Sequence, residues 1–102
     1  MTIVDASVAT AWFVPIATSS AAERIKKRPL LVAPALLRVE LVSSLLKYVR
    51  VGLLPGEHLL VASRQVGQLV EIRVPDEALL PAATGIALEH SLKIYDCLYL
   101  AL

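Results

Sequence analysis

Three acidic residues lie in apolar parts of the sequence, where a charge is costly. Asp5 ends the apolar run at residues 2–4, Glu40 lies in the middle of a long apolar stretch, and Asp96 lies in the apolar segment 94–102. An acid in such surroundings needs a partner, or its pKa rises until the group is neutral. One explanation covers all three acids, namely that they converge on a single divalent cation.

A hard divalent cation such as Mg²⁺ or Mn²⁺ suits three carboxylates, because it prefers oxygen ligands and keeps water in its coordination shell. Its charge also removes the repulsion between carboxylates that lie within about 5 Å of one another. Such a metal lowers the pKa of its bound water and orients that water against a phosphorus centre. We therefore predict that Asp5, Glu40 and Asp96 are both metal ligands and catalytic residues.

Each acid also has a simpler interpretation when it is taken singly. Asp5 could cap the helix that follows it, Asp96 could be a first-turn acid favoured by the helix dipole, and Glu40 could lie at a solvated helix edge. Ser7 is a candidate cap for a helix predicted at 8–13. The conjunction of the three acids favours a shared site over three separate roles.

Other catalytic motifs are missing from the sequence. It contains neither of the phosphate-cradling loops G-x-x-x-x-G-K-[ST] and G-x-G-x-x-G, and no G-x-S-x-G nucleophile turn. His58 and His90 are far apart and are expected to be exposed helix residues, so nothing suggests zinc. Cys97 is the single cysteine, which excludes an internal disulfide, fits a reducing cytoplasm and is expected to pack in the core.

Basic residues are unevenly distributed, although the formal net charge of +1 gives no strong indication of a polyanionic partner. Arg24, Lys26, Lys27 and Arg28 form one cluster. Cations at a helix C-terminus are favoured by the helix dipole, so the cluster has a structural interpretation. The alternative is that these four side chains face the phosphates of a nucleic acid.

Strands alternate with helices along the chain, which predicts an α/β fold with a parallel sheet flanked by helices on both faces. The carboxyl ends of parallel strands share one edge of the sheet, so Asp5 is expected at that edge, where open α/β folds build their sites. Asp76 is expected to cap its own helix. The predicted strands are 2–4, 30–32 and 70–74, and the predicted helices are 8–13, 18–27, 35–50, 56–69, 76–90 and one that begins near 95 and still runs at Leu102.

The 102 residues form one domain, 1–102. A hydrophobic fraction of 57% is high for a domain of this size, which predicts a surface covered by a second copy or by another protein. No run approaches the roughly 18 apolar residues of a membrane span, so no membrane association is expected. The N-terminus has no basic region ahead of an apolar core, so no secretory signal is expected.

The motifs along the chain resemble those of a PIN domain, most closely a VapC-type toxin ribonuclease. The segments 3–8 (IVDASV) and 94–102 (IYDCLYLAL) are the more specific ones. Between them lie 12–15 (WFVP), 33–42 (APALLRVELV) and 74–77 (VPDE), in the order and spacing that the family has. The resemblance covers essentially the whole chain.

The resemblance implies a parallel sheet with an acidic Mg²⁺ or Mn²⁺ site and endonucleolytic hydrolysis of RNA. It also implies inhibition by a VapB-type antitoxin, and a homodimer. Asp5, Glu40 and Asp96 match three of the family's site acids. Ser7 matches a polar position that often orders the first acid or its metal-bound water.

Two departures from the family pattern stand out. The family commonly has Asn three residues after the glutamate, where this chain has Ser43, a shorter supporting partner. The family also continues into a further strand with a fourth acid. This chain is therefore expected to be a PIN-like domain without its last strand, either as a truncated version of a longer protein or as a protein that lacks that acid and its strand. That strand would pair beside the first one, and its absence is expected to leave an open sheet edge.

Two alternatives to a metal-dependent ribonuclease toxin stay open. The first is a non-catalytic PIN remnant that still captures an antitoxin peptide, which the missing fourth acid favours. The second is a phosphoacceptor signalling domain, which is weaker because only Asp5 has a suitable position for that chemistry.

Overall fold

A computed structural model describes residues 1–72 and 74–102, which form a small parallel sheet and a larger set of helices. The strands are β1 (Thr2–Ile3) and β2 (Leu31–Val32), paired with Thr2 opposite Leu31 and Ile3 opposite Val32. The helices are α1 (Ala6–Phe13), α2 (Ser19–Lys26), α3 (Leu36–Arg50), α4 (His58–Leu69), α5 (Asp76–His90) and α6 (Ile94–Leu100). The prediction of an α/β chain with parallel strands is confirmed.

The predicted strand at 70–74 is shorter than expected. Glu71 forms an isolated parallel bridge with Val32, and its backbone N–H donates to the carbonyl of Leu31 at 2.7 Å. The physical reason is that α4 runs to Leu69 and Val70 ends it as the C-cap, so little chain remains before Pro75 leads into α5. Arg73, the last polar position of the predicted strand, lies outside the described residues.

The ends of most other elements differ from the prediction by one or two residues, and the first and last helices show why. The first helix begins at Ala6, two residues before the expected start, because Asp5 and not Ser7 is its N-cap. The last helix ends at Leu100 with Ala101 as the C-cap, so it does not run on through Leu102.

Two separate groups of buried side chains hold the helices. The first core lies among β1, β2 and α1 to α4, where Leu37, Leu41 and Leu45 form the predicted stripe of α3 and are fully buried. The second core lies between α5 and α6 and contains Leu79, Ala83, Cys97 and Leu98.

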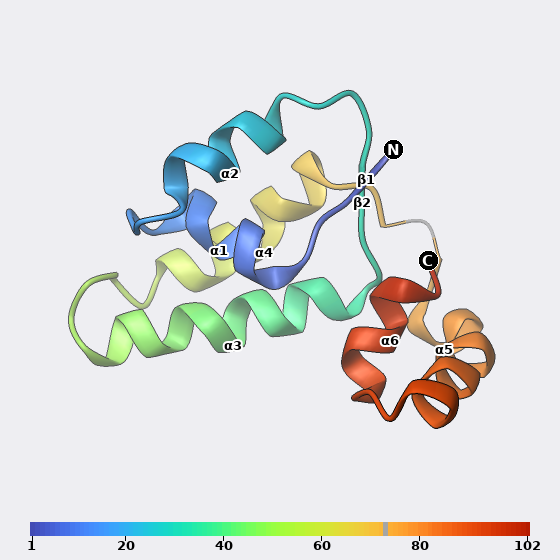
Figure 1. The fold of residues 1–102 in the computed structure, drawn as a ribbon. Helices are drawn as coiled ribbons and strands as arrows, with labels where there is room; N and C mark the ends of the chain where they lie inside the picture. Colours follow the sequence, from blue (N-terminus) through green and yellow to red (C-terminus); the bar gives the residue numbers. More distant parts are fainter. Residues whose placement is uncertain (73) are drawn as a thin grey trace.

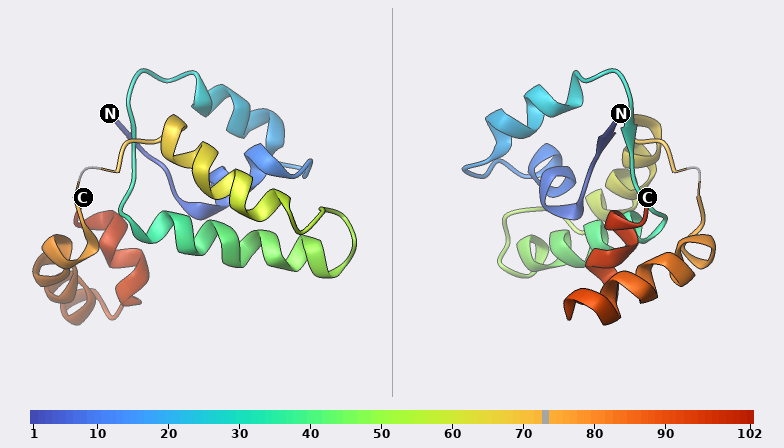
Figure 2. Two further views of the ribbon diagram at one scale, coloured as in Figure 1. Left: turned by 180° about the vertical axis from the view of Figure 1, so that it is seen from behind. Right: turned by 45° about the vertical axis from the view of Figure 1, so that its right-hand side comes forward.

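The two cores occupy different ends of the molecule. Helices α5 and α6 lie together beyond the carboxyl ends of the strands, beside the start of α3 (Figure 1). Helices α1 and α4 pack along α3, and α2 packs against α1. Two further views show the same separation (Figure 2). No described helix is long and apolar enough to cross a membrane.

Candidate active site

Asp5 lies at the carboxyl end of β1, where the strand turns into α1. Its Oδ1 accepts the backbone N–H of Val8 at 3.1 Å and the hydroxyl of Ser7 at 2.7 Å. The carboxylate therefore satisfies one of the first N–H groups of α1, which has no partner inside the helix. Ser7, which we predicted as the cap, instead donates to the residue that caps. Its bond restricts the rotation of the Asp5 carboxylate at the surface.

Glu40 comes from the second turn of α3 and is half-buried. The hydroxyl of Tyr99, on α6, donates to its Oε1 at 2.6 Å. Burial and then the nearby Glu40 carboxylate raise the pKa of Tyr99 well above its ordinary value of 10.0. Tyr99 is therefore neutral and able to donate this hydrogen bond at neutral pH.

Asp96 lies in the first turn of α6, where the helix dipole favours an acid. The adjacent residues Cys97 and Leu98 take the buried positions of this helix, and Asp96 is exposed. Asp5 is exposed as well. Apolar sequence neighbours therefore do not make a charge costly at these two positions, because Asp5 follows a strand end and Asp96 lies on an exposed face of its helix.

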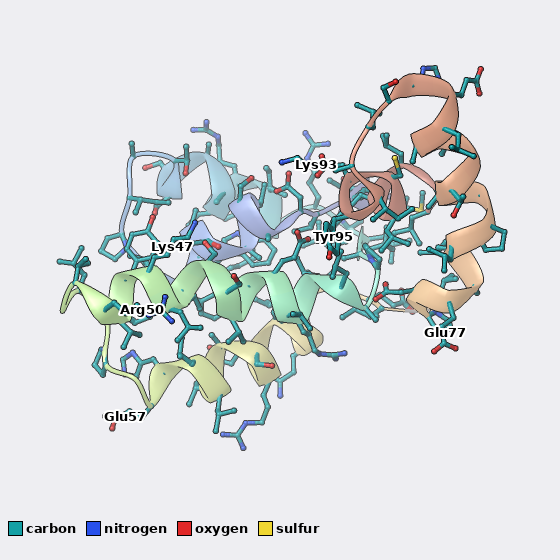
Figure 3. All side chains as sticks on the ribbon, turned by 90° about the horizontal axis from the view of Figure 1, so that it is seen from below. Lys47, Arg50, Glu57, Glu77, Lys93 and Tyr95 are labelled. Atoms are coloured by element: carbon teal, nitrogen blue, oxygen red, sulfur yellow. The ribbon has the colours of Figure 1, made fainter. Side chains whose placement is uncertain are left out.

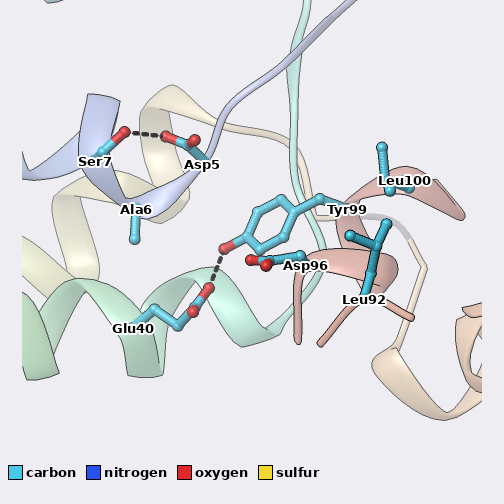
Figure 4. A pocket seen from close by; sticks show the side chains of 8 residues that line it. All are labelled: Asp5, Ala6, Ser7, Glu40, Leu92, Asp96, Tyr99 and Leu100. Carbon is cyan, nitrogen blue, oxygen red and sulfur yellow. Dashed lines mark hydrogen bonds between the residues drawn. The ribbon is translucent and has the colours of Figure 1, made fainter. Parts of the chain in front are cut away.

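One cavity brings the three acids together. It has a volume of about 450 Å³ and opens between the start of α1, α3 and α6 (Figure 4). Its lining residues are Asp5, Ala6, Ser7, Glu40, Leu92, Asp96, Tyr99 and Leu100. Residues that are far apart in the sequence therefore present carboxylates to one space at the carboxyl edge of the sheet.

Comparison with protein families shows which family the chain belongs to. A family model described as the PIN domain matches residues 2–102. The chain belongs to the PIN domain family. Membership places it in a superfamily whose members are generally nucleases and typically use divalent metals. Comparison with curated proteins gives no significant match.

The donor atoms of this PIN domain suit a hard divalent cation better than any soft metal, because they are carboxylate and hydroxyl oxygens. The positions of these side chains, in contrast, do not form a complete metal site. Among residues 1–72 and 74–102, no group of three or more His, Cys, Asp or Glu side chains is arranged to hold a metal ion. Asp5 is held by Ser7 and Glu40 by Tyr99, so two of the three acids have a side-chain partner from the protein at the cavity.

Ser43 was predicted to support the site, and the PIN domain places it on the exposed side of α3. It is not one of the described residues that line the cavity. The neighbouring Ser44 points to the first core, where it accepts a hydrogen bond from Thr10 at 3.0 Å. The supporting role of Ser43 stays a prediction.

The four residues of the basic cluster at 24–28 differ in how exposed their side chains are to solvent. Arg24, Lys27 and Arg28 are exposed, whereas Lys26 is half-buried. The ammonium of Lys26 lies 3.2 Å from Oε1 of Glu23 and 5.7 Å from the centroid of the Trp12 ring. Lys26 therefore serves partly to join α2 to α1, in keeping with the structural interpretation of the cluster.

A second cavity joins the basic helix to the acidic site. It has a volume of about 250 Å³ and is mostly apolar. Ser7 lines both cavities, so the two adjoin at the start of α1. The residues that line the second cavity are Ser7, Val8, Thr18, Ala21, Ala22 and Ile25.

Tyr99 is the site residue that our sequence reasoning missed. It lies three residues after Asp96 on the same helix, and residues at this spacing share a helix face. A tyrosine on the face that carries a predicted site acid was therefore a usable signal.

Proposed function

We propose that this PIN domain is a Mg²⁺- or Mn²⁺-dependent endoribonuclease of the VapC type, the toxin of a toxin–antitoxin pair. The observation that carries the proposal is the shared cavity of Asp5, Glu40 and Asp96 in a chain of a nuclease superfamily. The bound metal would supply an activated water for attack on a phosphodiester. Asp5, Glu40 and Asp96 would hold the metal, and Ser7 would orient Asp5 through its 2.7 Å hydrogen bond.

The RNA strand would extend from the acidic cavity toward α2. Ser7 lines both the acidic cavity and the apolar one beneath α2, and Arg24 in α2, Lys27 at its C-cap and Arg28 just beyond it offer exposed charges. Phosphates beyond the cleaved bond would pair with these cations. A reducing cytoplasm is the compartment that accords with a single, buried cysteine.

Two protein partners belong to the proposal, a VapB-type antitoxin and a second copy of the chain. Large apolar side chains remain exposed on the helices beside the acidic cavity. Leu88 is 80% exposed, Leu100 is 61% exposed and Tyr95 is 58% exposed. Apolar surface of this kind is covered when a partner binds.

Cleavage of a structured RNA by the purified protein tests the enzymatic part. We expect cutting with Mn²⁺ and none after chelation of the metal. Asp5→Asn should abolish cutting while the circular dichroism spectrum stays unchanged, because Asn caps a helix about as well as Asp. The matched control is Glu77→Gln, which neutralises an exposed acid outside the cavity and should cut like the wild type. Equal cutting by Asp5→Asn and the wild type would end the assignment.

The second candidate is a non-catalytic PIN remnant that binds an antitoxin. It is favoured by the absence, within the described part of the chain, of a three-acid group arranged around an ion. Calorimetry separates the two functions. Tight binding of an antitoxin peptide without any heat of Mg²⁺ or Mn²⁺ binding would support the remnant, whereas metal binding that Asp5→Asn removes would support the nuclease.

A further inference from the structure

The acidic cavity lies across the junction of the two cores. Asp5 and Glu40 belong to elements of the first core, whereas Asp96 belongs to α6, which packs chiefly against α5 in the second core. The distance of Asp96 from the other two acids therefore depends on how the α5–α6 pair is held against α3.

Few side chains cross this junction. The ring of Tyr99 packs against the first core, although its neighbours Cys97 and Leu98 belong to the second. Leu36, at the start of α3, packs in the opposite direction against the second core. Two hydrogen bonds run beside these contacts, one from Tyr99 to Glu40 and one from the Leu36 N–H to Asp76.

Of these two bonds, the one from Tyr99 ends inside the acidic cavity. It is short, at 2.6 Å, and its acceptor is a half-buried carboxylate, which makes it a charge-assisted bond. The hydroxyl donates to Oε1 of Glu40. The second carboxylate oxygen of Glu40 can then turn toward the cavity. Because Tyr99 follows Asp96 by three residues on α6, the same bond also fixes the part of the helix that carries Asp96 (Figure 4).

We propose that Tyr99 is a positioning residue of this site, whose hydroxyl sets Glu40 and Asp96 relative to each other by tying α6 to α3. Its effect on the metal rests on the proposed nuclease function, and its effect on the α5–α6 pair does not. A partner that orients a metal-binding carboxylate affects metal affinity about as strongly as some ligands do.

The substitution Tyr99→Phe tests this proposal because it removes the hydroxyl and keeps the packed ring. The matched control is Tyr95→Phe, which removes the hydroxyl of an exposed tyrosine from the same helix. Hydrogen exchange of the metal-free protein is measured first. We expect the α6 amides of Tyr99→Phe to exchange roughly tenfold faster or more, the loss expected for a bond to a charged group. The amides of α3 and the Tyr95→Phe protein should keep the wild-type rates.

A double-mutant cycle shows whether the effect passes through Glu40. In a Glu40→Ala background the acceptor is gone, so Tyr99→Phe should add nothing to α6 exchange. A purely structural role of Tyr99 would leave the full effect in that background. Unchanged α6 exchange in Tyr99→Phe, or an undiminished effect in the Glu40→Ala background, would overturn the proposal.

Calorimetric titration with Mn²⁺ measures the consequence for the site. Tyr99→Phe should weaken Mn²⁺ binding about 10- to 100-fold, and Tyr95→Phe should leave it unchanged. Equal Kd values for the two variants would overturn the positioning role. If the wild-type protein itself bound no Mn²⁺, the metal-dependent function would fail, and the exchange experiment would still decide whether Tyr99 ties α6 to α3.

Discussion

Asp76 caps a helix other than its own, and replacing it should show this directly. The residue before α3 is Ala35, whose methyl group cannot accept a hydrogen bond. The first N–H of the helix, that of Leu36, instead donates to Oδ1 of Asp76 at 3.1 Å, 40 residues further along the chain. The perturbation is Asp76→Ala, which removes the acceptor and the charge together.

The expected loss has two parts. Removing a side-chain cap from a helix start costs typically about 1 kcal/mol of the free energy of unfolding. Removing a carboxylate from near a helix N-terminus costs about 0.3–1 kcal/mol more, and Asp76 lies near the starts of both α3 and α5. Asp76→Ala should therefore lower the free energy of unfolding by about 1–2 kcal/mol. Asp76→Asn keeps an acceptor and should lose roughly 0.5 kcal/mol.

Urea unfolding followed by circular dichroism measures these differences. Glu77→Ala is the matched control, because Glu77 is the other acid in the first turn of α5 and points outward into solvent (Figure 3). Glu77→Ala should lower the free energy of unfolding only by the loss of the interaction with the helix dipole, about 0.3–0.5 kcal/mol. Equal losses for Asp76→Ala and Glu77→Ala would refute the capping of α3, and so would an Asp76→Asn protein as unstable as Asp76→Ala.

Three further predictions concern single positions. Asp5→Ala should lower the free energy of unfolding by about 1 kcal/mol and Asp5→Asn by much less, since Asn also caps; equal urea midpoints would contradict this. Gly85→Ala should raise the free energy of unfolding by about 1 kcal/mol, because Gly85 lies inside α5 with no atom within 4 Å of an added Cβ; a lowered urea midpoint would contradict it. The raised pKa of Tyr99 in the folded state means that its stabilising contribution is complete below pH 10.0, the unfolded value, and declines as the pH rises above it. The unfolding free energy of the wild type should therefore fall between pH 9 and pH 11. The fall should be less than about 1.4 kcal/mol per pH unit, because Tyr99 is only half-buried. Tyr99→Phe should give a flatter curve, and parallel curves for the two proteins would contradict a raised pKa of Tyr99.

The sequence predicts the elements better than it predicts the residues that join them. The leucine stripe of α3 and the order of strands and helices follow from periodicity, which reports which face of an element is buried. Asp5 was placed at the carboxyl edge of the sheet by topology alone, and the structure has it there. These features depend on local sequence, so one chain is sufficient to recognise them.

The contacts that join these elements to one another are not encoded by local sequence. Asp76 was expected to cap α5, because a polar residue before a helical pattern is the usual signal, but its oxygen is bonded to Leu36. The predicted strand at 70–74 has the right alternation, yet Val70 is the C-cap of α4, and among the described residues of this segment Glu71 makes the bridge to Val32. Tyr99 had no local signal for its partner Glu40, which is 59 residues away.

The exposure of the three acids bears on how a bound cation would affect the stability of the fold. Asp5 and Asp96 are exposed and Glu40 is half-buried, so water screens much of their mutual repulsion. A cation that binds the folded state at 100 times its Kd would still add about 2.7 kcal/mol to the free energy of unfolding. A cation held by all three acids would also bridge the two cores, because Asp96 is the acid that comes from the second core. Metal binding and the bond from Tyr99 to Glu40 would therefore stabilise the same contact between α6 and α3, and each should strengthen the other.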